Sequence, residues 1–251
     1  AIRVLLGFLP PSSGVARIFG RDCWGDSRAI KAEVGYLPGD LRLYPWLSGL
    51  EAVRIVERVR RKTLLASARD LAELFDLDLK VKVRHMSRGM RQKLGIILAL
   101  AHRPQLLVLD EPTMALDPLM QATLQAHLRE LASKGHTLFF SSHTLSEVEQ
   151  LCDEVAIIRQ GKIVANESLA SLRNKVRRQA TIRFRAHSIP EQAPPILDNL
   201  RQDGMTWTGS LHGSVDELVA FLAAYELEDL IVEAPDLETL FRSYYDDRGK
   251  T

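Results

Sequence analysis

A short apolar run near the middle of the chain ends directly in two adjacent carboxylates. The run extends from Leu106 to Leu109 and is followed by Asp110 and Glu111. A continuous apolar run bounded by polar residues and proline is typical of a strand buried in a parallel sheet. Ligands of open α/β sheets bind beyond the carboxyl ends of such strands. The pattern therefore predicts an α/β fold with a site at Asp110 and Glu111.

The two carboxylates suit different tasks. Asp110 is a candidate ligand of Mg²⁺, directly or through a water molecule. Glu111 is a candidate for polarising a water molecule that attacks a phosphate. The alternative is a strand that merely stops in a charged turn, so the flanking sequence has to decide.

Three further motifs flank the carboxylates in a fixed order. Upstream, Ser87-Arg88-Gly89 precedes an apolar, helix-like stretch from Leu94 to Ala101. Downstream come Ala115-Leu116-Asp117 and then a second apolar strand, Thr137 to Ser141, which ends at Ser142-His143. This ordered set resembles the ATP-binding subunit of ABC transporters. It matches a signature-like Ser-x-Gly before a helix, a Walker B strand, a D-loop and a switch histidine, and the resemblance covers about residues 1–170.

The resemblance implies a role for each motif. Glu111 would polarise the attacking water, Asp110 would hold Mg²⁺ and His143 would contact the γ-phosphate of ATP. Two subunits would dimerise head to tail, with Ser87, Arg88 and Gly89 of one facing the ATP of the other. Asp117 would lie in the loop that crosses the dimer interface. The site residues expected on this basis are catalytic Glu111 and His143, metal-binding Asp110, and nucleotide-binding Ser87, Arg88, Gly89, Asp117, Gly39 and Asp40.

Several positions depart from the family pattern. The signature Leu-Ser-Gly-Gly-Gln is replaced by the sequence from Met86 to Met90, and Ser87 alone would also serve as a simple helix N-cap. The glutamine of the Q-loop is replaced by Gly39. The following Asp40 either substitutes as a metal-linked residue or only completes a turn. A structural role is likewise the alternative for His143.

The phosphate-binding loop of the family, G-x-x-x-x-G-K-S/T, is absent from the 251 residues. In the family this loop precedes a helix that resembles residues 1–9, so we expect a fragment that starts just after the loop. A naturally truncated, inactive protein is the alternative. Without the loop, which cradles phosphates through backbone N–H groups and a lysine, ATP affinity should be severely reduced.

We expect two domains. Residues 1–172 would form the P-loop NTPase-like ABC ATPase core, with a helical subdomain at about 45–100. Residues 176–251 would form a small α+β module with a βαβαβα pattern. Its strands are expected at 181–185, 205–211 and 230–233, and its helices at 188–201, 215–224 and 237–245.

Composition narrows the functional classes. The chain has 46% hydrophobic residues and a net charge of +1, which argues against a large nucleic-acid-binding surface. It contains no apolar run long enough for a transmembrane helix, and its start does not resemble a secretory signal. The two distant cysteines, Cys23 and Cys152, are expected to be free thiols in a reducing cytosol.

The organisation most resembles the ATPase of bacterial ABC-2-type exporters. ATP hydrolysis would then drive a separate transmembrane permease, and the chain would lie at the cytoplasmic face of the inner or plasma membrane. The loop at Gly39-Asp40 and the helical insert would form the docking face. Two alternatives stay open: a soluble ABC ATPase that acts on nucleic acid or ribosomes, and a degenerate subunit that docks without hydrolysing ATP. A soluble ATPase of that kind would need a long coiled coil or a second ATPase core, and neither is present. For the degenerate subunit, Glu111 and His143 argue against it and the missing phosphate-binding loop argues for it.

Overall fold

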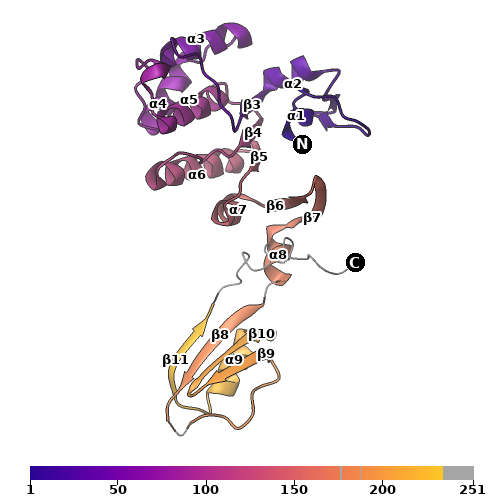
Figure 1. The fold of residues 1–251 in the computed structure, drawn as a ribbon, viewed down its shortest axis with the longest axis vertical. Helices are drawn as coiled ribbons and strands as arrows, with labels where there is room; N and C mark the ends of the chain where they lie inside the picture. Colours follow the sequence, from indigo (N-terminus) through magenta and orange to yellow (C-terminus); the bar gives the residue numbers. More distant parts are fainter. Residues whose placement is uncertain (176, 187, 234–251) are drawn as a thin grey trace. The chain divides into compact units, whose positions relative to one another are not determined.

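The computed structural model describes residues 1–175, 177–186 and 188–233 (Figure 1). The chain divides into two compact units, Ala1–Leu151 and Cys152–Thr251. The boundary expected between residues 172 and 176 therefore lies inside the second unit.

A three-stranded parallel sheet forms the centre of the first unit, in the order β3 (Val34–Leu37), β4 (Leu106–Asp110) and β5 (Thr137–Ser141). In register, β4 pairs through Leu106 with Val34 on one side and with Thr137 on the other. The three middle residues of β4 are buried, as the apolar run predicts for a strand with neighbours on both sides. The parallel α/β sheet expected from the sequence is therefore present.

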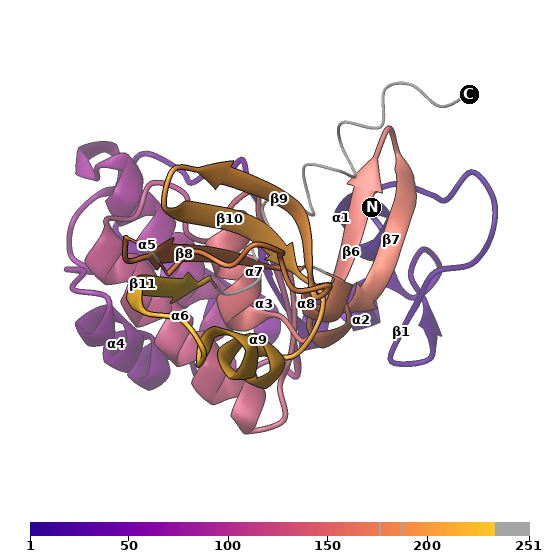
Figure 2. The same ribbon diagram turned by 90° about the horizontal axis from the view of Figure 1, so that it is seen from below.

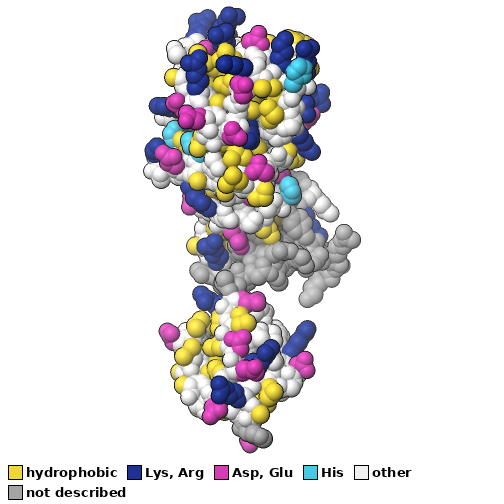
Figure 3. All heavy atoms as spheres, turned by 90° about the vertical axis from the view of Figure 1, so that its left-hand side faces the viewer, with side chains coloured by type: hydrophobic (Ala, Val, Ile, Leu, Met, Phe, Trp, Pro, Cys, Tyr) yellow, Lys and Arg dark blue, Asp and Glu magenta, His cyan; other side chains and the backbone are white. Residues whose placement is uncertain are grey.

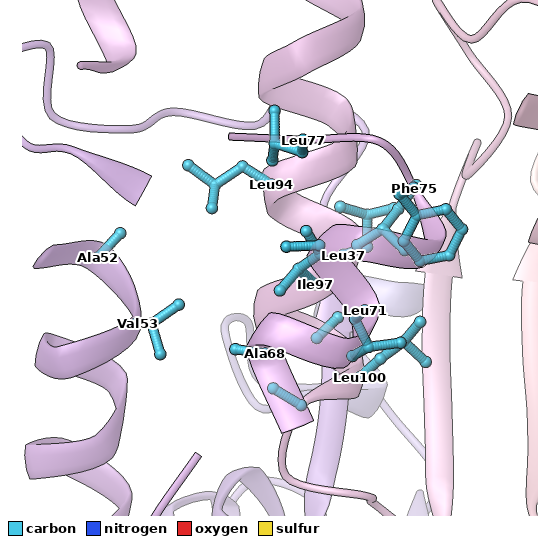
Figure 4. Close-up of a cluster of buried hydrophobic side chains, with 14 of the residues drawn as sticks. Leu37, Ala52, Val53, Ala68, Leu71, Phe75, Leu77, Leu94, Ile97 and Leu100 are labelled. Atoms are coloured by element: carbon cyan, nitrogen blue, oxygen red, sulfur yellow. The ribbon is translucent and has the colours of Figure 1, made fainter. Parts of the chain in front are cut away.

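Helices pack against this sheet and against one another. The helices are α3 (Gly49–Arg60), α4 (Leu65–Leu74), a 3₁₀ turn at Val83–His85, α5 (Arg88–Leu100), α6 (Pro118–Ser133) and α7 (Leu145–Leu151). Figure 4 shows the buried side chains that join α3, α4 and α5 to β3, among them Leu37, Val53, Phe75 and Ile97. The helical region expected at about 45–100 thus shares one apolar core with the sheet.

Helix α5 approaches β3 unusually closely at Gly35. A Cβ atom built on Gly35 would lie 2.3 Å from the carbonyl oxygen of Ala99 and 2.7 Å from Leu107 Cδ2. No side chain fits in that space, so glycine is required for the helix to pack on the strand at this distance. This contact places the C-terminal end of α5, at Ala99, against the sheet.

The N-terminal segment differs from the expected helix over residues 1–9. Helix α1 covers only Ile2–Leu5. It ends because Gly7 adopts φ +60° and the N–H groups of Gly7 and Phe8 bond back to the carbonyls of Val4 and Arg3 at 3.0 and 2.8 Å. This is the Schellman termination, which the glycine in the sequence favours.

The rest of this segment is a short hairpin, β1 (Arg17–Ile18) and β2 (Arg21–Asp22), followed by α2 (Ser27–Glu33). Helix α2 was not predicted from the sequence. Only Ile30 of its seven residues is buried, so it carries little apolar periodicity to detect.

The second unit begins with an antiparallel hairpin, β6 (Glu154–Arg159) and β7 (Lys162–Ser168), followed by α8 (Leu169–Lys175). The hairpin turns at Gln160-Gly161, and both turn residues have positive φ angles.

A four-stranded antiparallel sheet follows, in the order β11-β8-β10-β9. Its elements are β8 (Arg178–Phe184), β9 (Leu197–Asp203), β10 (Thr206–Leu211), α9 (Val215–Leu222) and β11 (Leu227–Val232). Helix α9 packs against this sheet (Figures 1 and 2), and Leu218 and Leu222 share a buried cluster with Ile182, Phe184 and Trp207.

The helix predicted at 188–201 is wrong. Residues 188–196 form no helix, and β9 begins at Leu197. Pro194 and Pro195 explain the difference, since a proline lacks the N–H of a helical hydrogen bond and excludes the residue before it from the helical region. The module is therefore βββαβ over the described residues, and the helix expected at 237–245 lies outside them.

The surface carries mixed charge. In Figure 3 acidic and basic side chains are interspersed over both units on the face in view. None of the helices in the described residues combines the length and apolar character that a membrane span needs.

Candidate active site

The carboxyl ends of β4 and β5 lie side by side, and the Ser141 hydroxyl forms hydrogen bonds between them. Asp110 pairs with Ser141 in the sheet register. The Ser141 hydroxyl donates to Asp110 Oδ1 at 2.5 Å, and the Glu111 N–H donates to Ser141 Oγ at 3.2 Å. Both carboxylate residues are thus fixed by the neighbouring strand.

Glu111 has a left-handed backbone conformation, with φ +51°. A non-glycine residue in this region costs on the order of 1–3 kcal/mol, so the surrounding structure must hold it. Gln92 does so from α5, because its Nε2 donates to the carbonyl oxygens of Glu111 at 3.3 Å and Pro112 at 3.0 Å. Gln92 is 6% exposed. The sequence analysis missed this residue, although a glutamine within the apolar stretch of a helix is a detectable signal.

The side chain of Glu111 pairs with His143. The distance from Glu111 Oε2 to His143 Nδ1 is 2.7 Å. The Glu111 side chain is 26% exposed and that of His143 is 77% exposed. Two residues 32 positions apart in the sequence therefore form one hydrogen-bonded pair that solvent can reach.

Asp110 faces the end of β3. A Cβ built on Gly39 would lie 3.1 Å from Asp110 Oδ2, so the glycine leaves this oxygen without a side chain against it. Burial, and next the negative charge of Asp110, raise the pKa of the nearby Tyr36 phenol. Asp40 instead bonds to Arg42 at 2.8 Å, and both side chains are exposed on the surface.

These residues fit a Mg²⁺ ion that is bound mainly through substrate. Within residues 1–175, 177–186 and 188–233, no group of three or more His, Cys, Asp or Glu side chains is arranged to hold a metal. Mg²⁺ at nucleotide sites takes one or two carboxylates plus phosphates and water, and Asp110, whose Oδ2 lies beside Gly39, supplies one such carboxylate.

The signature-like residues lie against the loop that follows Pro112. Ser87 caps α5, with its Oγ accepting from the Met90 N–H at 3.1 Å. Arg88 lies 3.3 Å from Met114 Sδ, and a Cβ on Gly89 would lie 2.8 Å from the carbonyl oxygen of Ala115. The N-cap role considered for Ser87 is present, and the residue is exposed at a helix N-terminus that favours an anion.

Asp117 ends the same loop. Its Oδ1 accepts from the Met120 N–H at 3.0 Å and caps α6, where Pro118 occupies the first turn. Ala115, two residues earlier, has φ +64°. The expected D-loop is therefore a strained loop closed by a helix cap and packed on the start of α5.

A buried carboxylate, Glu147 in α7, completes the site. Its Oε1 accepts from the Thr113 hydroxyl at 2.5 Å and its Oε2 from the Ser142 hydroxyl at 2.7 Å. The sequence analysis did not single out Glu147, Thr113 or Ser142. The available signal was a glutamate in the first turn of the helix that follows His143.

Sequence comparisons place the chain among transport ATPases. The family described as "ABC transporter" matches residues 1–114, which include Asp110 and Glu111. An uncharacterized ABC transporter ATP-binding protein of Synechocystis sp. is 32% identical over 260 residues, covering 100% of this chain and 72% of the relative. The bacitracin transport ATP-binding protein BcrA of Bacillus licheniformis is 34% identical, covering 81% of this chain and 69% of the relative. An uncharacterized Nostoc relative is 37% identical over 68% of this chain, but the chain spans only 52% of its length.

Solved structures agree with the fold. A structure described as the ATP-binding subunit of an ABC transporter is 28% identical, with a TM-score of 0.64, over 69% of this chain and 75% of that chain. A dimeric ATP-binding cassette, in a post-hydrolysis state bound to ADP and Pi, is 19% identical, with a TM-score of 0.58, over 67% of this chain and 78% of that one. The second similarity concerns the fold alone.

Proposed function

The chain belongs to the family of ABC transporter ATP-binding proteins, and from that premise we propose that it hydrolyses Mg²⁺-bound ATP to power a separate membrane permease. One observation carries the proposal. Glu111 and His143 form a solvent-accessible pair 2.7 Å apart at the carboxyl ends of β4 and β5, next to Asp110. This is where a parallel α/β sheet binds its ligand.

The roles follow from the contacts. Glu111 Oε accepts a proton from the attacking water and makes its oxygen more nucleophilic. His143 donates its Nδ1–H to Glu111, and in the doubly protonated ring its Nε2–H donates toward the γ-phosphate. Asp110, whose Oδ2 lies beside Gly39, would hold Mg²⁺, and the ion would neutralise charge on the phosphates.

The nucleotide-binding residues act on a second copy of the chain. Ser87, Arg88 and Gly89 lie together at the start of α5, and Asp117 closes the loop packed on them. In the proposed head-to-tail dimer they face the ATP held by the partner subunit. The dimeric cassette among the structural neighbours supports this arrangement only as an analogy of fold.

The permease partner follows from the relatives, whose names include bacitracin transport and linearmycin resistance. On this chain, Tyr44 and Trp46 support a docking surface between β3 and α3. Their rings lie 5.0 Å apart and their exposed fractions are 63% and 64%. A permease segment bound there would hold the chain at the cytoplasmic face of the membrane.

A second candidate is a docking subunit that does not turn over ATP. The departures from the family pattern at residues 86–90 and at Gly39 are compatible with it. The two candidates differ in turnover and not in fold.

The test is ATP hydrolysis by the protein expressed from its full reading frame. We expect phosphate release that requires Mg²⁺ and that Asp110→Asn reduces by about 100-fold or more, since a neutral amide is a poor Mg²⁺ ligand. The control is Asp203→Asn, an exposed position in β9 of the second unit. Hydrolysis that persists in EDTA, or equal activity of Asp110→Asn and the wild type, would contradict the proposed role of Asp110; no Mg²⁺-dependent hydrolysis in the wild type would favour the docking subunit.

A further inference from the structure

One buried carboxylate of the first unit has no part in the chemistry above. Glu147 is 5% exposed, and it lies in α7 just after the loop that carries His143. A charged group is almost never buried to this extent unless other groups satisfy it. Its two oxygens therefore need partners, and the structure supplies one to each.

The partners come from the two loops of the site. Thr113, two residues after Glu111, donates its hydroxyl to Oε1 at 2.5 Å. Ser142, directly before His143, donates its hydroxyl to Oε2 at 2.7 Å. Thr113 is also buried, so this contact is shielded from water.

Each oxygen of Glu147 is bound by a different hydroxyl. The Ser142 oxygen also accepts from the Thr144 N–H at 2.9 Å and lies 3.3 Å from the Thr144 carbonyl oxygen. The contact of the Ser142 hydroxyl with Glu147, at 2.7 Å, is the shorter of its two possible donor contacts.

We propose that Glu147 is a positioning residue for the hydrolysis step, because its carboxylate ties Thr113 to Ser142 and so holds Glu111 and His143 at contact distance. This inference rests on the proposed function of that pair. Ser141 ties the strand ends directly before Glu111, at Asp110. Glu147 provides the second connection, between Thr113, which follows Glu111, and Ser142, which precedes His143. The two connections together fix the geometry of the pair.

The isosteric variant Glu147→Gln tests the inference. The amide keeps the shape but presents an N–H₂ donor to one of the two hydroxyl donors, so one tie is lost. Because a small misplacement of reacting groups costs up to about 100-fold, we expect kcat to fall about 10- to 100-fold. The KM for MgATP should change by less than about threefold, since Asp110 and the signature residues Ser87, Arg88 and Gly89 are untouched.

Two further variants remove the hydroxyl groups that donate to Glu147. Thr113→Val and Ser142→Ala each delete one hydroxyl donor and should lower kcat without a matching change in KM. Each should have less effect in the Glu147→Gln background than alone, because the variants break the same connection. The control is Glu149→Gln, which makes the same change of charge on the same helix and should leave kcat and KM at wild-type values.

A spectroscopic readout separates this inference from the proposed function. In protein labelled with ¹⁵N-histidine, Glu147→Gln should move the His143 ring resonances toward those of Glu111→Gln, in which the partner of the ring is changed. If the wild type hydrolyses no ATP, the proposed function is wrong. The His143 ring resonances then still test whether Glu147 positions His143. Unchanged His143 resonances in folded Glu147→Gln, or a kcat within about twofold of the wild type, would overturn the positioning role. A rise in KM alone would overturn it as well.

Discussion

At the scale of single residues, strained or crowded positions gather around the candidate site. Glu111 and Ala115 have positive φ angles, and Gly89 lies where no side chain fits. Such positions persist only when surrounding contacts fix them, and they cluster at functional sites. The contacts that do so here are those from Gln92, Ser141 and Glu147.

Gly89→Ala should impair hydrolysis more than it impairs folding. The new Cβ would lie 2.8 Å from the Ala115 carbonyl oxygen, so the loop before Asp117 must move away from α5. We expect turnover to fall by about tenfold or more. The control is Gly25→Ala, where the nearest atom, Asp22 Oδ1, lies at an ordinary 3.4 Å. Wild-type turnover in a folded Gly89→Ala protein would show that the packing of loop on helix is unimportant for activity.

His102 should make stability depend on pH. It is 7% exposed, and burial, with the positive charge of Arg60 as the next cause, lowers its pKa from 6.5 to about 4. The unfolded chain therefore binds more protons than the folded chain between these values. The free energy of unfolding should be highest above pH 6.5 and fall as the pH drops toward 4, by at most about 3 kcal/mol.

Denaturant titrations of the wild type and of His102→Leu at several pH values measure this effect. The substitution should flatten the profile in that window. His127, whose pKa is also lowered by burial, would leave a smaller slope. An equally steep profile in His102→Leu would exclude His102 as the cause.

At the scale of elements, the approach of α5 to β3 is the contact that most constrains the first unit. Gly35→Ala would place a Cβ 2.3 Å from the Ala99 carbonyl oxygen, a backbone atom that cannot move without shifting the helix. We expect the free energy of unfolding to fall by about 1–3 kcal/mol, as for other overpacked cores. Equilibrium denaturation measures it, and a change below about 0.5 kcal/mol would mean that α5 and β3 adjust freely.

The elements also show how far local sequence determines this structure. The strand at Leu106–Asp110 was predicted because a short apolar run bounded by polar residues is a local signal. The stretch before Leu197 was mistaken for a helix, although Pro194 and Pro195 exclude one there. The contacts of Gln92 with Glu111 and of Glu147 with Thr113 could not be predicted, because they join residues 19 and 34 positions apart and depend on tertiary packing.

At the scale of the whole molecule, comparisons with known proteins confirm the fold class and the family expected from the ordered motifs. The division of the chain was harder to predict, since the second unit starts at Cys152 and not after residue 172.

Sharing of the site between two copies predicts a dependence on concentration. If Ser87 and Gly89 act on the ATP of the partner subunit, hydrolysis should rise faster than linearly with protein concentration below the dimer dissociation constant. Mixing Ser87→Arg and Glu111→Gln proteins should restore part of the activity, because both defects can fall on one of the two composite sites of a heterodimer. If heterodimers form and the mixture shows only the average activity of the two inactive parent proteins, this result would contradict a shared site whose two halves act independently.

The central claim is that Glu111 carries out the chemical step, and a single-turnover measurement tests it most directly. ATP labelled at the γ-phosphate is bound to an excess of protein, and phosphate release is followed for the wild type and for Glu111→Gln. The amide keeps the shape of the side chain but is a far weaker base, so release should slow by about 100-fold or more while the fraction of ATP bound stays unchanged. Release at the wild-type rate from fully bound ATP would contradict the account.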